Sequence, residues 1–182
     1  MNESKNVKKR KGNYIVNSIV VVVLGALYIP NLPLNEWTSH FIHANIFHLL
    51  GNMIFVSILN KDIDTSKLTL RSLFVWLFAY LTASVCWGIT ANAVGFSGIL
   101  YFIWGYRLPN DLNIIKEKRT KIKYLSGIVL VMLISLVVPS LSFSMHFFPM
   151  LVGALLGKIF QLIDEYKKDM ESLNITRKYK DK

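Results

Sequence analysis

The stretch 95–106, Gly-Phe-Ser-Gly-Ile-Leu-Tyr-Phe-Ile-Trp-Gly-Tyr, is an apolar segment with a single serine, Ser97, near its start. A polar side chain in hydrocarbon is costly, so a serine in a membrane segment is a candidate functional residue. Such a serine can also bond to a helix carbonyl or help helices pack, and Gly95 and Gly98 favour close packing. Ile99 stands where the nucleophile elbow of soluble hydrolases needs glycine. Ser97 by itself therefore leaves packing and chemistry both open.

The composition indicates a membrane protein. Of the 182 residues, 53% are hydrophobic, although the formal net charge is +10. The apolar residues form long runs and the basic residues form short clusters, which is typical of a polytopic membrane protein. We therefore expect the basic clusters to set topology and meet anionic lipids, and we expect no nucleic-acid partner. The single cysteine, Cys86, lies in an apolar run, so an intramolecular disulfide is excluded.

Six apolar segments predict an all-α fold of six transmembrane helices. They are 13–29, 46–59, 73–89, 94–106, 124–138 and 147–162, within a membrane domain at 13–166 between basic tails at 1–12 and 167–182. No small-x-small cleavage pattern follows the first segment, so we interpret it as a retained helix rather than a signal peptide. The central fourth segment is the shortest. With its flank it gives about 24 Å of helix against a core of about 30 Å, so it should begin below the membrane surface.

The positive charges predict the orientation. Of the 21 Lys and Arg residues, 20 lie in alternate connections and at the two ends, while the loops at 30–45, 90–93 and 139–146 contain none. Both termini are therefore expected in the cytoplasm, and the number of helices is even. The second, fourth and sixth helices then start at the outer side. The polar residues near those starts should lie at one depth, and they are His43, His48, Asn52, Ser97 and His146.

A serine and a histidine at one depth suggest a nucleophile and its base. A neutral imidazole can take the proton of a serine hydroxyl, although His146 could also simply face water from its loop. Glu36 is the only carboxylate on the predicted outer side, and it lies in a loop. Any serine mechanism should therefore use a dyad.

His48 and Asn52 are four residues apart on one helix face, and both can donate hydrogen bonds to a developing oxyanion. His43 precedes His48 by five residues, about 140° around a helix, so it should face elsewhere and have a structural role. His40 is expected to be a surface residue. Metal binding is the rival interpretation, but the histidines lack an i,i+4 ligand pair and an inward acid, so we expect neither metal nor cofactor.

Other residues at helical spacing are candidates for support and packing. Tyr101 and Gly105 share a face with Ser97, so Tyr101 either packs on His146 or is an ordinary packing aromatic. Gly153 and Gly157 form a GxxxG pattern, which should let the sixth helix approach the fourth and bring the histidine to the serine.

These residues together resemble the rhomboid intramembrane serine proteases. The match comprises Trp37-Thr38-Ser39, His43-x4-His48-x3-Asn52, Gly95-x-Ser97-Gly98 with Tyr101 and Gly105, and His146 with Gly153. The resemblance implies that Ser97 is the nucleophile and His146 its general base. It also implies an oxyanion hole of His48, Asn52 and the Ser97 backbone N–H, with Tyr101 stacked on His146 and His43 bracing the loop before the second helix.

The resemblance further implies that the substrates are transmembrane segments, which pass the fifth helix and are cut near their outer end. Three features depart from the family pattern. The first outer loop is short, Thr38 follows Trp37 where arginine is common, and Pro149 stands where glycine commonly follows the histidine. These departures concern substrate handling more than the chemistry.

The sequence therefore predicts an intramembrane serine endopeptidase in a prokaryotic plasma membrane, with its site open to the extracytoplasmic side. The alternative is a catalytically inactive rhomboid-like protein that binds transmembrane helices. A small transporter is disfavoured, because the helix interiors lack the charged residues that would line its path.

Overall fold

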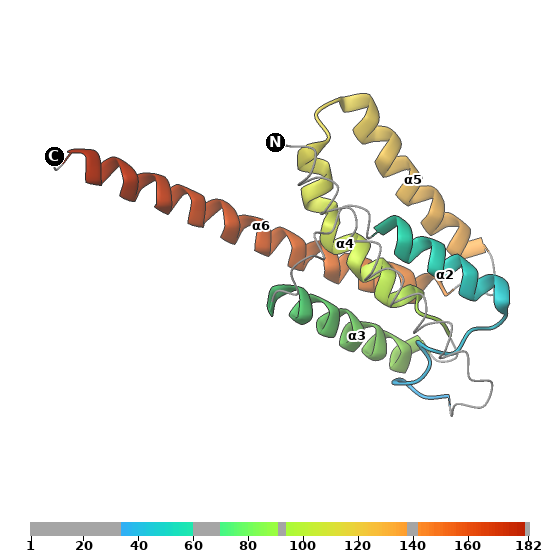
Figure 1. Ribbon diagram of the computed structural model, residues 1–182. Coiled ribbons are helices and arrows are strands. Elements are labelled where there is room, and N and C mark those ends of the chain that lie inside the picture. Colours follow the sequence, from blue (N-terminus) through green and yellow to red (C-terminus); the bar gives the residue numbers. More distant parts are fainter. Residues whose placement is uncertain (1–33, 60–69, 91–93, 138–141, 181–182) are drawn as a thin grey trace, which may run out of the picture.

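The computed structural model describes residues 34–59, 70–90, 94–137 and 142–180, and within these ranges the regular structure is entirely helical. The helices are α2 (Ile46–Leu59), α3 (Leu70–Thr90), α4 (Ser97–Ile114), α5 (Lys118–Val137) and α6 (Phe143–Lys180) (Figure 1). The predicted helix at 13–29 lies outside the described residues. Among the described helices, α3, α5 and α6 are long and apolar enough to cross a membrane.

Two helices continue beyond their predicted ends. α2 has the predicted bounds, but α4 runs eight residues past 106, through Pro109 to Ile114. An i,i+4 ion pair between Arg107 and Asp111, 3.6 Å apart, supports this polar extension, which an apolar pattern does not reveal. α6 likewise crosses the expected boundary at 166 without a break and reaches Lys180 beyond the rest of the bundle (Figure 1).

α4 is the central helix of the described structure. It packs along α6 and also contacts α3 and α2. Ile99, Leu100, Phe102 and Ile103 of α4 are almost completely buried. They belong to a hydrophobic core that includes Leu49 and Val56 of α2 and Ala79 and Ala83 of α3. Because these side chains are packed among the neighbouring helices, the start of α4, and with it Ser97, is held in a defined place.

Glycines allow the backbones of α4 and α6 to touch. A Cβ on Gly105 would lie 2.0 Å from the Met150 carbonyl oxygen, and one on Gly153 would lie 2.1 Å from that of Phe102. A Cβ on Gly157 would lie 2.1 Å from the Tyr106 carbonyl oxygen. Gly98 is less crowded, because a Cβ there would lie 3.3 Å from its nearest neighbours, which are atoms of Ala83 and Met145. Any side chain at the first three positions would push the two helices apart.

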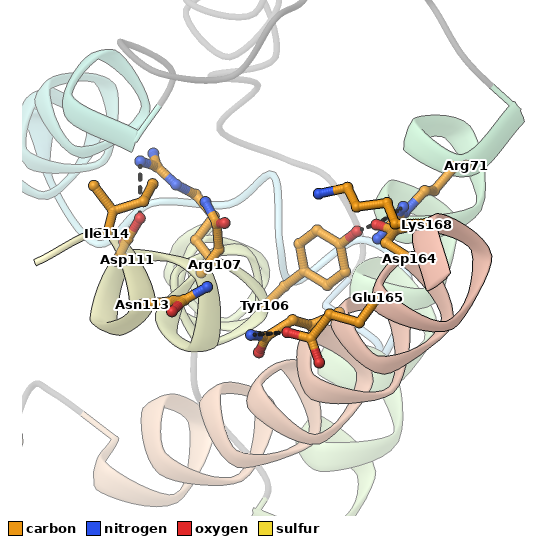
Figure 2. A pocket seen from close by; sticks show the side chains of 12 residues that line it. Arg71, Tyr106, Arg107, Asp111, Asn113, Ile114, Asp164, Glu165 and Lys168 are labelled. Atoms are coloured by element: carbon orange, nitrogen blue, oxygen red, sulfur yellow. Dashed lines mark hydrogen bonds and ion pairs between the residues drawn. The ribbon is translucent and has the colours of Figure 1, made fainter. Parts of the chain in front are cut away.

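A polar cluster joins three helices around the middle of α4. Arg71 of α3 donates to Asp164 of α6 over 2.7 Å and to the Tyr106 hydroxyl of α4 over 3.0 Å. These side chains line a cavity of about 650 Å³. Figure 2 shows them meeting at one side of this pocket, with Arg107 and Asp111 at the other. The cavity is lined by both charge signs and lies away from Ser97, so we assign the cluster a role in helix packing.

α5 is the least embedded of the described helices. Ile128 and Ser135 are its only buried residues, whereas apolar side chains such as Val129 and Leu136 are exposed. It packs mainly on α6, and the Trp104 indole N–H of α4 donates to the hydroxyl of its Tyr124 over 3.0 Å. Most of its surface is therefore available to lipid.

Candidate active site

Ser97 is the first residue of α4, and the turn before it determines its position. Gly95 has φ of +111°, a conformation that side-chain-bearing residues rarely adopt, and its N–H donates to the Ser39 carbonyl over 2.8 Å. The first backbone N–H groups of a helix have no intrahelical acceptor and carry the positive end of the helix dipole. The Ser97 hydroxyl thus lies beside free donors that favour negative charge.

His146, near the start of α6, reaches Ser97 across 49 positions of sequence. Its Nε2 lies 3.0 Å from Ser97 Oγ, and the residue is only 4% exposed. The Tyr101 ring stacks on the imidazole with a centroid separation of 4.2 Å and an interplanar angle of 19°. The hydrogen bond and the stacked ring together restrict how the imidazole can turn, which is the geometry a serine nucleophile and its base require.

His48 and Asn52 of α2 converge on Gly95, two residues before Ser97. A Cβ on Gly95 would lie 2.7 Å from His48 Nε2 and 3.4 Å from Asn52 Nδ2. Gly95 lies just ahead of α4, and the neighbouring helix that approaches it is α2, through these two side chains. Its missing side chain leaves the room that the two donors occupy.

The Asn52 amide is an unpaired donor in a buried place. The residue is 5% exposed, and its Nδ2 has no hydrogen-bond acceptor among the residues that the structure describes. Buried polar groups are nearly always paired, so an exception near a nucleophile calls for an explanation. A substrate oxygen bound at this point would supply the missing acceptor.

The expectation that His43 faces away from His48 is wrong. α2 begins only at Ile46, so helical spacing does not apply to His43. Its ring packs edge-on against the His48 ring with centroids 5.3 Å apart, and its Nδ1 lies 3.2 Å from the Phe41 carbonyl oxygen. His43 therefore supports His48 from the loop.

His40 is likewise not a surface residue. It is fully buried, and its Nε2 lies 3.0 Å from Ser84 Oγ of α3. Burial lowers the pKa of His40 to about 4, so the ring is neutral at neutral pH. The reason is that the loop folds onto α3, where the Tyr80 hydroxyl donates to the Trp37 carbonyl over 2.9 Å.

Ser135 of α5 is a site residue that the sequence analysis missed. It is 2% exposed, and its Oγ lies 2.9 Å from His146 Nδ1, the ring nitrogen that does not face Ser97. The available signal was a serine in the predicted outer half of the fifth apolar segment, at the depth that the sequence predicts for His146. Ser126 on the same helix is exposed, so a serine in that segment was not by itself diagnostic.

The described residues include no group of three His, Cys, Asp or Glu side chains that could hold a metal ion. The assembled groups are a serine, a histidine bonded on both ring nitrogens, and an unpaired amide beside the start of a helix. Such groups are suited to nucleophilic attack on a carbonyl followed by stabilisation of the resulting oxyanion.

Comparison with known proteins identifies the domain. A family model described as the Rhomboid domain matches residues 34–162, which is well over half of the chain. The match includes α2, α4 and the start of α6, with every residue assembled around Ser97. No curated protein matches the chain.

Proposed function

The chain belongs to the rhomboid family of membrane proteins, and from this premise we propose that it is an intramembrane serine endopeptidase that uses Ser97 and His146. The observation that carries the proposal is the 3.0 Å separation between His146 Nε2 and Ser97 Oγ. Two side chains on different helices are held at hydrogen-bonding distance inside an apolar bundle, which simple packing does not require.

In the proposed reaction, Ser97 Oγ attacks the carbonyl carbon of the scissile peptide bond while His146 Nε2 takes the hydroxyl proton. The carbonyl oxygen becomes an oxyanion, which accepts hydrogen bonds from Asn52, His48 and the Ser97 backbone N–H. Collapse of this intermediate breaks the C–N bond, and the leaving amine receives the proton from His146. Water then hydrolyses the Ser97 ester with the same histidine as base.

Hydrolysis requires water at Ser97. Along α4, Ser97 and Arg107 are ten residues apart, which is about 15 Å of rise against a hydrocarbon core of about 30 Å. If Arg107 marks the cytoplasmic boundary, Ser97 lies well below the outer surface. The short apolar part of α4 therefore supports a water-filled depression that opens to the extracytoplasmic side.

The proposed substrates are transmembrane segments of other proteins, cut near their outer end in a six-helix bundle whose termini are cytoplasmic. The weak embedding of α5 supports lateral access along that helix. The clustering of basic residues in one set of loops supports cytoplasmic termini and contacts of these loops with anionic lipids. The proposed location is a prokaryotic plasma membrane, and nucleic acid is not a proposed partner.

The proposal is tested with purified wild type, Ser97→Ala and His146→Ala, using a fluorescent transmembrane substrate and a serine-directed activity probe. Ser126→Ala is the matched control, because it removes an exposed hydroxyl from α5. We expect cleavage and labelling in wild type and Ser126→Ala, and neither cleavage nor labelling in Ser97→Ala. His146→Ala should not cleave. His48→Ala and Asn52→Ala should each lower turnover by about 10²- to 10³-fold.

Equal cleavage by wild type and Ser97→Ala would contradict the proposal. So would a wild type that the probe does not label under conditions where an active rhomboid reacts. Binding of the transmembrane segment without cleavage would instead support the inactive, helix-binding alternative.

A further inference from the structure

The second ring nitrogen of His146 is bonded to α5. Ser135 Oγ lies 2.9 Å from His146 Nδ1 and 3.1 Å from the Val131 carbonyl oxygen one turn earlier. Ser135 and Ile128 are the only buried residues of α5, and Ser135 is the one that reaches the imidazole. The histidine therefore lies between two serine hydroxyls from different helices.

Two proton arrangements are possible for a neutral imidazole in this place. In the first, the Ser135 hydroxyl donates to the Val131 carbonyl and accepts from His146 Nδ1–H, and Nε2 accepts from Ser97. In the second, Ser135 donates to Nδ1, and Nε2–H donates to Ser97. Only the first leaves Nε2 able to take the Ser97 proton.

The surroundings favour the first arrangement. Among Ser97, His146, Ser135 and the Val131 carbonyl, it makes three hydrogen bonds, whereas the second makes two. A net hydrogen bond between neutral groups corresponds to roughly a 3- to 10-fold ratio between two states. Among the described residues, the side chains bonded to the His146 ring are the two serines, and no carboxylate is bonded to it.

We propose that Ser135 is a positioning residue that accepts the Nδ1–H of His146 and thereby holds the tautomer in which Nε2 faces Ser97 as a base. This inference rests on the proposed function. Ser135 supplies the orienting acceptor that an aspartate supplies in a catalytic triad, but without placing a charge in the membrane.

The test compares Ser135→Ala, Ser135→Thr and the control Ser126→Ala, each with the transmembrane substrate. Ser135→Ala should lower kcat by roughly 3- to 10-fold and leave KM unchanged, because the hydroxyl does not touch the substrate. Ser135→Thr keeps a hydroxyl that can bond to the same carbonyl, so it should restore kcat. Ser126→Ala should match wild type.

A second readout does not depend on turnover. In protein labelled with ¹⁵N-histidine, with the signal assigned by its loss in His146→Ala, the wild-type His146 ring should carry its proton on Nδ1. Ser135→Ala should move protonation toward Nε2, and Ser135→Thr should not. If wild type cleaves nothing, the ring spectrum still tests the tautomer, so failure of the proposed function is distinguished from failure of this inference.

The inference is overturned if Ser135→Ala keeps both the kcat of Ser126→Ala and a protonated Nδ1. It is also overturned if Ser135→Ala and Ser135→Thr lose activity equally and melt at equally lowered temperatures, since that pattern would indicate a role in packing alone.

Discussion

Replacing Gly153 by alanine tests whether contact between the α4 and α6 backbones positions the candidate site. The new Cβ would lie 2.1 Å from the Phe102 carbonyl oxygen and 2.9 Å from the Tyr106 nitrogen. Both neighbours are backbone atoms of α4, so no side chain can turn away to make room. The helices themselves must separate.

The size of the separation follows from the distances. Moving the Phe102 oxygen from 2.1 Å to an ordinary contact of 3.4 Å requires a shift of about 1.3 Å. His146 lies two turns before Gly153 on the same helix, so a comparable shift would stretch its 3.0 Å bond to Ser97 beyond hydrogen-bonding distance. Overpacking of this kind costs about 1–3 kcal/mol, and a misplacement of about 1 Å can lower a rate by about 10²-fold.

Gly127→Ala is the matched control, because a Cβ at this exposed position of α5 meets nothing within 4 Å. Thermal unfolding in detergent and turnover of the transmembrane substrate are measured for both variants. Gly153→Ala should melt earlier and lose most of its turnover, while Gly127→Ala should be as stable as wild type or slightly more stable. If the two variants behave alike, the tight α4–α6 contact does not position Ser97 and His146.

Three further predictions concern neighbouring residues. Gly95→Ala should lower the free energy of unfolding by about 1–3 kcal/mol and remove most turnover, because φ is +111° and the new Cβ would lie 2.5 Å from His48 Cε1. A variant that melts at the wild-type temperature and keeps the wild-type kcat would refute this prediction. Tyr101→Phe should keep turnover, because its ring still stacks on His146. Tyr101→Ala should lose a stacking interaction worth about 0.5–1.5 kcal/mol, and its kcat should fall several-fold. Equal kcat values for the two variants would exclude a role for the stack. Because burial lowers the pKa of His40 to about 4, below its ordinary 6.5, protonation favours the unfolded state. The free energy of unfolding should therefore fall by about 2 kcal/mol from pH 7 to pH 5. Thermal unfolding at the two pH values measures this loss, and His40→Gln should remove it. The same loss in His40→Gln as in wild type would show that His40 is not its source.

The apolar pattern predicts the described helices because it follows from the cost of moving each residue type into hydrocarbon. α2 has the predicted bounds for this reason. The far end of α4 and the extension of α6 were missed because a polar helix supported by i,i+4 pairs leaves no apolar signal. His43 was assigned the wrong direction because helical spacing was applied to a residue that precedes the helix.

The sequence by itself determined that this chain is a helical membrane protein, with Ser97, His146, His48 and Asn52 as its candidate site. Charge placement decides which helix ends lie on the same side of the membrane, so the sequence constrains only the depth of these four residues. Only the tertiary structure decided which side chains meet at that depth. α5 is apolar on most sides, so its periodicity does not indicate which face turns inward, and only packing against α6 places Ser135 on the second nitrogen of His146.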